Sequence, residues 1–386
     1  MQMRFIQLAI VLIGPSVVSS QVARAVDYWQ QGPFKVGVRT EVFIDDAREC
    51  AITHQPRTLV TEIWYPTVDE PTTPKNTFAD FWLNEMGVGA GRFAMSRFGG
   101  DFDKINESFK TVAYRDAAIR EGKSPLLIFS HGNGGFRHQN TYQAEYLASH
   151  GYVVAAADHT GNAAVTILPD RMMIYTKLTR EPERRDDRPH DVSFLISHLT
   201  KLSESADHWL SGRLTPDAIG MFGHSFGGFT TCRTTELDDR IKAAMPMTLA
   251  SSLWTEEGED QSEPCPIPLM VILGDADRTV KEKGNRVSTA YFEKATGPKY
   301  LLNFKDAGHF TFTEMTQINP NFGDGIGVEK DKDGNVTLEF SDPLEDQRIT
   351  NAYSAAFFDA YTKGDVEALG FLDENHTPEE MDFRQN

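Results

Sequence analysis

Ser225, Asp277 and His309 are the residues whose types and surroundings could together carry out covalent catalysis. Ser225 is the centre of a Gly-His-Ser-Phe-Gly motif that follows the apolar run 218–222 and precedes a segment suited to a helix. A strand, a sharp turn and a helix in this order expose a nucleophilic serine, and glycines leave room for its strained backbone. A serine hydroxyl is a weak nucleophile until a base takes its proton. The motif therefore predicts Ser225 as a nucleophile that needs partners downstream.

Those partners lie after two later apolar runs. His309 stands in a Gly-His turn after the strand-like run 300–304, and we predict it as the base. The run 269–274 ends next to two carboxylates, Asp275 and Asp277. One of them should orient the imidazole and stabilise the imidazolium that forms. We favour Asp277, since a new helix follows it, while Asp275 is the alternative or caps the turn.

A glycine-rich loop could supply the oxyanion hole. The apolar run 124–129 leads into Ser-His-Gly-Asn-Gly-Gly at positions 130–135. Such a loop lets a backbone amide approach the substrate carbonyl, and the second donor usually comes from the residue after the nucleophile. We predict the backbone N–H groups of Asn133 and Phe226 as the two donors.

Taken together, these motifs resemble a known family of esterases. They are G-H-S-F-G-G around Ser225, S-H-G-N-G-G-F-R at 130–137, G-D-A-D-R-T-V at 274–280 and G-H-F-T-F at 308–312. The chain from about Val36 to Asp365 is similar to platelet-activating-factor acetylhydrolases and to bacterial dienelactone-hydrolase-like esterases and lipases. Dienelactone hydrolases proper use a cysteine nucleophile, so a serine here favours ordinary ester hydrolysis. The resemblance implies calcium-independent hydrolysis of carboxylic esters through an acyl-enzyme, but it does not name the acyl or alcohol group.

Apolar runs and helical segments alternate along the chain. The expected strands are 36–45, 57–65, 125–129, 152–158, 218–222, 242–247, 269–274 and 300–304, and the expected helices are 139–149, 191–203, 226–237, 281–294 and 350–363. Alternation of this kind indicates a mostly parallel sheet with helices on both faces. The first two strands have no helix between them and should pair antiparallel at one edge. We therefore expect an α/β class protein with the α/β-hydrolase fold.

Two insertions, at about 71–114 and 163–188, interrupt this alternation and are rich in large apolar residues. We expect them to form a cap or lid over the nucleophile. Within the first, we predict that Phe81, Trp82 and Phe93 line the acyl side of the substrate pocket. The alternative is that these aromatic residues fill a satellite core.

The first 25 residues are expected to be a signal peptide, with Arg4 before an apolar stretch and an Ala-Arg-Ala site at 23–25. Cleavage before Val26 would leave residues 26–386 as a single domain with the two insertions. No later segment approaches ~18 continuous apolar residues, so stable membrane insertion is not expected. These features predict a secreted or periplasmic protein.

Composition limits the partners. The net charge is −18, and loss of Arg4 and Arg24 with no acids would make it −20, which argues against nucleic acid or anionic lipid as partners. No His, Cys, Asp and Glu cluster has ligand spacing, so we expect neither a metal nor another cofactor. The three cysteines, Cys50, Cys232 and Cys265, are not expected to form a disulfide. The expected partner is a small or lipid-like ester, and the sequence does not indicate an oligomeric state.

Two rival functions remain at this point. The same triad cleaves amides, so an amidase or peptidase would carry the same residues. A hydrolase-fold protein that has lost catalysis would act as a binding module instead. Parallel ester and anilide assays separate the first rival, and covalent labelling with a fluorophosphonate separates the second.

Overall fold

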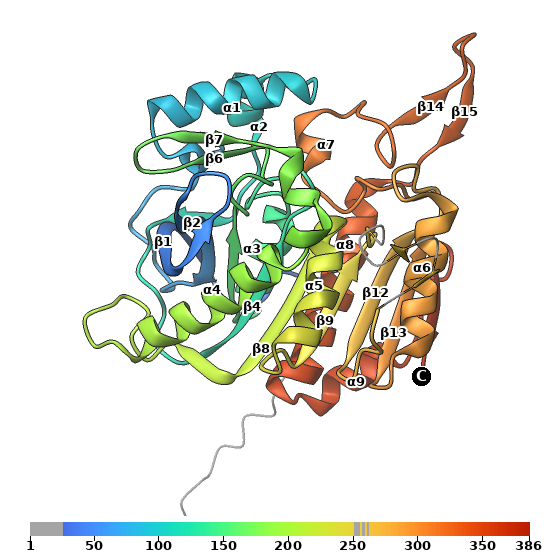
Figure 1. The fold of residues 1–386 in the computed structure, drawn as a ribbon. Helices are drawn as coiled ribbons and strands as arrows, with labels where there is room; N and C mark the ends of the chain where they lie inside the picture. The colour runs from blue at the N-terminus through green and yellow to red at the C-terminus, as the bar shows by residue number, and fades with distance from the viewer. Residues whose placement is uncertain (1–25, 251–254, 257–258, 261) are drawn as a thin grey trace, which may run out of the picture.

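The centre of the molecule is a twisted sheet of ten strands (Figure 1), seen in a computed structural model that describes residues 26–250, 255–256, 259–260 and 262–386. The expected signal peptide lies outside these residues. The strands, in the order in which they lie across the sheet, are β16 (Met381–Gln385), β13 (Lys299–Phe304), β12 (Leu269–Gly274), β9 (Ala243–Met247), β8 (Leu214–His224), β4 (Ser124–Ser130), β5 (Val153–Ala157), β2 (Gln55–Pro66), β1 (Val36–Cys50) and β3 (Ala113–Arg115).

The six central strands from β13 to β5 run parallel to one another. They are short apolar runs, and β5, β9 and β12 are buried along their whole length. A parallel strand covered by helices on both faces loses the polar alternation of a half-exposed strand, which explains these continuous apolar runs. The predicted fold class, a mostly parallel sheet between helices, is confirmed.

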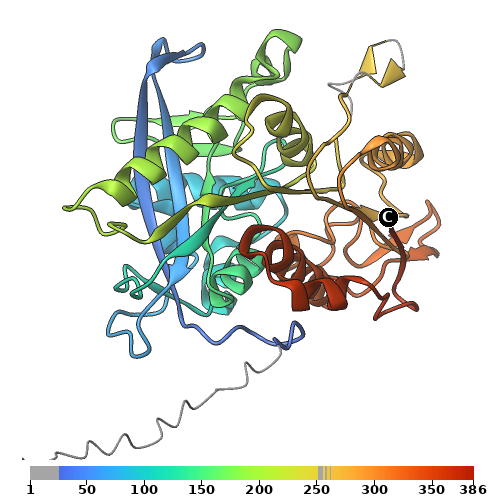
Figure 2. The same cartoon turned by 90° about the horizontal axis from the view of Figure 1, so that it is seen from below.

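Helices cover both faces of the sheet, as the view from below shows (Figure 2). The helices are α1 (Glu85–Arg97), α2 (Phe102–Ser108), α3 (Thr141–Ser149), α4 (Asp187–Glu204), α5 (Phe226–Leu237), α6 (Lys281–Lys294), α7 (Met315–Ile318), α8 (Pro343–Phe358) and α9 (Val366–Leu372). Helices α3, α8 and α9 lie on one face, and α4, α5 and α6 on the other. Successive residues of β4 point to opposite faces, so both faces need cover. Leu127 packs with Leu147 in the core on the α3 side, and Ile128 packs with Leu195 on the α4 side.

The sheet edges hold most of what the sequence analysis missed. Strands β1 and β2 pair antiparallel as predicted, from Val36 opposite Pro66 to Cys50 opposite Gln55. The short strand β3 lies outside β1, so β1 is not the last strand. At the other edge β16 pairs antiparallel with β13, and no strand was expected there. The cysteines Cys50, Cys232 and Cys265 are buried free thiols.

The helices of the first insertion and the hairpin of the second lie together at the top of the molecule in Figure 1, at the carboxyl end of the parallel strands. Residues 71–114 form the short 3-10 helix Ala79–Trp82, α1, α2 and strand β3. Residues 163–188 form the hairpin of β6 (Val165–Ile167) and β7 (Met172–Ile174), two more 3-10 turns at Lys177–Arg180 and Pro182–Arg184, and the start of α4. Helix α1 packs against β6, so the two insertions support each other.

Two other small hairpins lie outside the sheet. They are β10 (Thr255–Glu256) with β11 (Glu259–Asp260), and β14 (Val328–Lys330) with β15 (Val336–Glu339). Among the described residues, every helix is too short or too polar to cross a bilayer.

Candidate active site

Ser225 occupies a sharp turn between β8 and α5. Its backbone has φ 56° and ψ −114°, a conformation that residues other than glycine rarely adopt. The surrounding chain leaves no space for larger neighbours: a Cβ on Gly223 would come within 2.3 Å of the Gly227 carbonyl oxygen, and one on Gly227 within 1.8 Å of that of Ser130. The Ser225 N–H donates to the Met247 carbonyl at 2.9 Å, which ties the turn to β9. Local sequence therefore forms this strained turn, as the motif predicts.

His309 and Asp277 meet at the ends of the next strands. The carboxylate Oδ2 of Asp277 lies 2.7 Å from Nδ1 of His309, and both side chains are buried. Oδ1 of Asp277 accepts the backbone N–H groups of Thr279 and Val280, each at 2.8 Å. This grip fixes the carboxylate in a position where it can accept a hydrogen bond from a proton held on Nδ1 of His309, an arrangement that leaves Nε2 free to act as a base.

The second carboxylate of the turn has another task. Oδ1 of Asp275 accepts the backbone N–H of Asp306 at 2.7 Å, and burial raises the pKa of Asp275. Asp275 thus joins the end of β12 to the turn before His309. The geometry places Asp277 beside the imidazole and gives Asp275 the turn-capping position that was its alternative.

His224, the residue before the serine, links two loops of the site. Its Nε2–H donates to the His309 carbonyl at 2.8 Å, and its Nδ1 accepts from the Gln139 amide at 3.0 Å. Oε1 of Gln139 in turn accepts the Gly132 N–H at 2.9 Å. Burial holds the pKa of His224 well below its usual value, and the neutral ring has the one donor and one acceptor that this chain of bonds needs. The sequence analysis missed this link, although His224 lies inside the motif.

The two predicted oxyanion donors belong to the loop after β4 and to the start of α5. Asn133 sits in the loop after β4, and within the described residues its backbone N–H makes no hydrogen bond. Phe226 is the first residue of α5, where an N–H has no partner within the helix. The loop is held by Gly134 N–H to the Asn162 carbonyl and by Gly135 N–H to the Gly132 carbonyl, both 3.0 Å. Both amides are therefore available to a developing negative charge.

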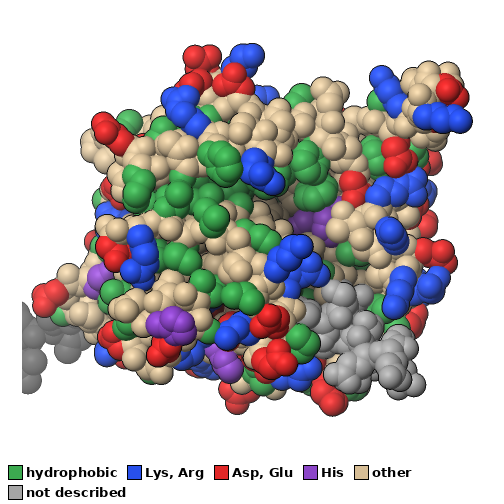
Figure 3. Space-filling model, turned by 45° about the horizontal axis from the view of Figure 1, so that its top comes forward, with side chains coloured by type: hydrophobic (Ala, Val, Ile, Leu, Met, Phe, Trp, Pro, Cys, Tyr) green, Lys and Arg blue, Asp and Glu red, His purple; other side chains and the backbone are tan. Residues whose placement is uncertain are grey.

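A mostly apolar cavity of about 200 Å³ adjoins the triad. Ser225, His309 and residues 132–135 of the loop after β4 are among its lining residues. Its remaining lining includes Phe78, Phe98, Phe109, Phe136, His138, Gln139, Phe310, Thr313, Glu314, Met315 and Ile318. A neighbouring groove of about 480 Å³ shares Phe98, Asn133 and Gly134 with the cavity. Figure 3 shows a hollow on this face, with a histidine in it and apolar side chains gathered beside it.

The prediction that Phe81, Trp82 and Phe93 line the acyl pocket is wrong. Phe81 and Trp82 do not line this cavity; they are buried one layer behind it, where Trp82 packs edge-on against Phe102 and Phe136 at 6.1 and 5.5 Å. Phe93 is 60% exposed and lines the neighbouring groove. The 3-10 helix turns its aromatic face into the insertion's own core, and only Phe78 at its start reaches the cavity.

Glu314 is a polar group in the cavity that the sequence analysis did not find. Its carboxylate accepts the Tyr142 N–H at 2.6 Å and also pairs with the Gln317 amide. Burial raises the pKa of Glu314 to about 7. Within the part of the chain that the structure describes, no three His, Cys, Asp or Glu side chains are grouped to hold a metal ion.

Comparison with known proteins shows which families and structures this chain resembles. Residues 20–181 match the family described as platelet-activating factor acetylhydrolase, isoform II. A platelet-activating factor acetylhydrolase of Cavia porcellus is 28% identical, over 78% of this chain and 71% of its own length. The Bos taurus protein of that name is 29% identical over 61% of this chain, but that alignment spans only 58% of the bovine protein. A probable 1-alkyl-2-acetylglycerophosphocholine esterase of Arthroderma benhamiae is 26% identical over 55% of the chain and 56% of its own length.

Among solved structures, a ferulic acid esterase from Streptomyces cinnamoneus superposes with a TM-score of 0.64 and 24% identity, over 86% of this chain and 91% of that one. This likeness confirms the α/β-hydrolase fold. The sequence relatives confirm the predicted resemblance to platelet-activating factor acetylhydrolases and the predicted enzyme class, a carboxylic ester hydrolase.

Proposed function

We propose that this protein is a serine esterase that cleaves small or lipid-like carboxylic esters through an acyl-enzyme. The observation that carries the proposal is a serine in a strained turn, at the mouth of an apolar cavity that it shares with an imidazole held by a buried carboxylate at 2.7 Å. The names of the sequence relatives, which include acetylhydrolases and an acetylglycerophosphocholine esterase, support the same reaction.

In the first half of the proposed reaction, Oγ of Ser225 attacks the ester carbonyl carbon while Nε2 of His309 takes the hydroxyl proton. Asp277 stabilises the imidazolium, and the Asn133 and Phe226 N–H groups donate hydrogen bonds to the negatively charged oxygen that was the carbonyl oxygen. The tetrahedral intermediate then breaks its bond to the alcohol oxygen, which leaves with the proton from His309. In the second half, water gives a proton to His309, attacks the acyl carbon and releases the acid with regeneration of Ser225.

The two spaces beside Ser225 suggest how an ester would lie. The 200 Å³ cavity is walled by phenylalanines and suits a short or compact apolar group. The groove beside Asn133 is more open and suits the larger half of a lipid-like ester. We propose that the acyl group enters the cavity and the alcohol lies in the groove.

Export is a further part of the proposal. The basic start, the apolar stretch and the Ala-Arg-Ala site of residues 1–25 support a secreted or periplasmic enzyme with a chain that begins at Val26. N-terminal sequencing of the protein recovered outside the cytoplasm tests this, and an N-terminus at Met1 would contradict it.

The central test is Ser225→Ala with p-nitrophenyl esters of increasing acyl length. Loss of a triad nucleophile lowers kcat by ~10⁴-fold or more, so the variant should be nearly inactive while its melting temperature is kept. The intact mass of the wild-type protein should rise by one fluorophosphonate adduct, and that of the variant should not. A variant that keeps more than about a tenth of wild-type kcat would show that Ser225 is not the nucleophile.

A further inference from the structure

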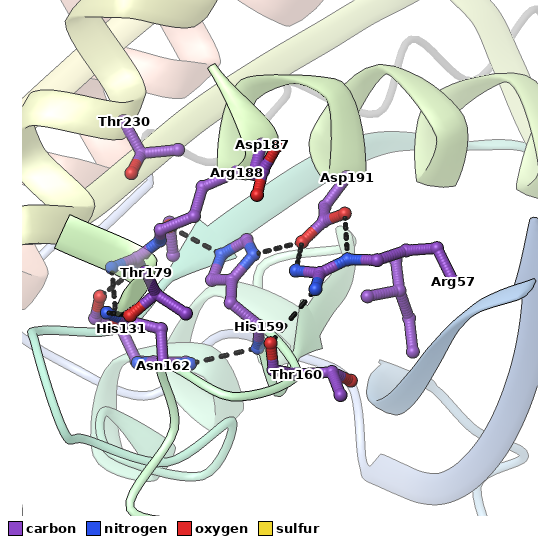
Figure 4. A network of polar contacts seen from close by, with 12 residues as sticks. Arg57, His131, His159, Thr160, Asn162, Thr179, Asp187, Arg188, Asp191 and Thr230 are labelled. Atoms are coloured by element: carbon purple, nitrogen blue, oxygen red, sulfur yellow. Dashed lines mark hydrogen bonds and ion pairs between the residues drawn. The ribbon is translucent and has the colours of Figure 1, made fainter. Parts of the chain in front are cut away.

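Arg188 is a buried cation at the start of α4, and its side chain lies beside His131 and Asn162 (Figure 4). Its guanidinium donates to Oγ of Ser130 at 2.8 Å, to Oδ1 of Asn162 at 3.0 Å and to the carbonyl of His131. All three acceptors are neutral. Two of them, on Ser130 and His131, belong to the segment that leads from β4 to Asn133, so one planar group fixes the course of that segment.

The same guanidinium also touches the other half of the oxyanion hole. The carbon at its centre lies 4.5 Å above the ring of Phe226. A guanidinium over an aromatic face is attracted by the ring and stacks on it. Arg188 therefore contacts both chain segments whose amides we assign to the oxyanion hole, one through the His131 carbonyl and one through the Phe226 ring.

Among the described residues Arg188 forms no ion pair, although the nearby charge of Asp191 opposes the fall in its pKa. Its neighbour Asp187 pairs with Arg184 at 3.6 Å. One turn further along α4, the carboxylate of Asp191 is held by Arg57 at 2.6 Å and also accepts from the ring of His159. A buried cation without an ion pair is destabilising, and burial lowers the pKa of Arg188 to about 9.

We propose that Arg188 is a positioning residue for the oxyanion hole of this enzyme: it holds the Asn133 and Phe226 amides in place, and its charge, which no ion pair holds among the described residues, favours the oxyanion that forms between them. The inference rests on the proposed function and adds to it a residue that never touches the substrate. A charge that is costly in the resting protein becomes favourable as negative charge develops nearby, because attraction is strong in a water-poor site.

The test compares oxygen esters with the matching thionoesters, in which sulfur replaces the carbonyl oxygen. Sulfur is larger and accepts hydrogen bonds poorly, so the ratio of kcat/KM for ester over thionoester reports how well the oxyanion hole is formed. Arg188→Lys keeps a cation but loses the planar fork that reaches Ser130, His131 and Asn162. We expect it to lower kcat/KM for p-nitrophenyl acetate at least tenfold, mostly through kcat, and to lower the ester-to-thionoester ratio at least fivefold.

The matched control is Arg57→Lys. Arg57 is equally buried and bonds to Asp191 and to the Thr160 carbonyl, but it touches neither oxyanion segment. We expect this variant to lose melting temperature and to keep the wild-type ratio within twofold. The proposal is overturned if the ratio stays within twofold in Arg188→Lys, or if it falls as far in Arg57→Lys.

If Arg188→Lys does not fold, Phe226→Leu is measured in the same way, because it removes the ring under the guanidinium and keeps the backbone N–H. A reduced ratio supports the proposal, and an unchanged ratio overturns it. The two levels of inference fail differently. An inactive wild-type protein that fluorophosphonate does not label refutes the proposed esterase, whereas an active wild-type with an unchanged ratio in the variants refutes only the role of Arg188.

Discussion

Replacement of Asp277 by asparagine should disable the base without disturbing the fold, and the hydrogen bonds show why. Oδ1 of Asp277 accepts two backbone N–H groups, from Thr279 and Val280, at 2.8 Å each. In Asp277→Asn the amide oxygen must keep that position, because an amide NH₂ cannot accept from those donors. The NH₂ group is then turned toward Nδ1 of His309, 2.7 Å away in the wild-type protein.

A donor at that position reverses the tautomer of the imidazole. Nδ1 must now accept, so the proton moves to Nε2, and Nε2 can no longer take the proton of Ser225. Loss of both the tautomer and the stabilising charge lowers kcat by about 10⁴-fold, which corresponds to about 5 kcal/mol of barrier. Because the two bonds to Oδ1 remain, the melting temperature should hardly change.

The assay is kcat with p-nitrophenyl acetate at pH 8, with Asp275→Asn as the matched control. Asp275 lies in the same turn, but its bond to the Asp306 N–H needs only an oxygen, which asparagine retains. The control should keep kcat within about tenfold of wild type. An equal or larger loss in Asp275→Asn, or a loss below tenfold in Asp277→Asn, would refute the tautomer argument.

Three further predictions follow from the cavity and the chemistry. Trp82→Ala should destabilise the protein by ~3–5 kcal/mol and lower kcat/KM equally for all acyl lengths, because the ring lies in the core. Phe109→Ala, at the cavity wall, should instead lower kcat/KM more for longer acyl chains, by up to ~0.8 kcal/mol of transition-state binding for each methylene. Glu314→Gln tests a buried acid, because the Glu314 carboxyl stays protonated up to about pH 7 in the folded protein but ionises near pH 4.5 in the unfolded chain. As the pH rises through that window, the wild type should lose up to ~3 kcal/mol of unfolding free energy relative to the variant. The same pH dependence of the unfolding free energy in both proteins would contradict this prediction. EDTA should leave esterase activity unchanged, because every step uses the triad and backbone amides; loss of activity that calcium or zinc restores would contradict this.

The residues that we propose as the triad could be picked out from the sequence because each one follows a strand end and a local turn. Ser225 needs the glycines on either side of it, and those glycines are visible as letters. The carboxyl ends of neighbouring parallel strands meet at one edge of the sheet, so Asp277 and His309 come together once the strand order is that of a doubly covered parallel sheet. The choice between the two aspartates could only be favoured from sequence, since it depends on which oxygen meets which backbone N–H.

The acyl pocket is different because it depends on how an insertion folds against the rest of the chain. Phe78, Phe81 and Trp82 stand at the helical spacing i, i+3 and i+4, which indicates one aromatic face but does not say what that face packs against. In the structure the face packs on Phe102 and Phe136, and the cavity is left to side chains from several distant segments. The edge strand β16 was missed for a related reason: five residues with mixed burial carry little pattern of their own, and their partner β13 supplies the pairing.

The arrangement around Arg188 matters because the proposed oxyanion donors are backbone N–H groups. The proposed oxyanion hole consists of two N–H groups that no side-chain substitution can remove, so its geometry must be set by what holds the backbone. On one side His224 and Gln139 connect the His309 carbonyl to the Gly132 N–H, and on the other Arg188 connects the His131 carbonyl to Phe226. The first chain of contacts is neutral and the second carries the only charge. Substitutions along the first should therefore disturb base and oxyanion hole together, whereas those at Arg188 should change the oxyanion hole alone.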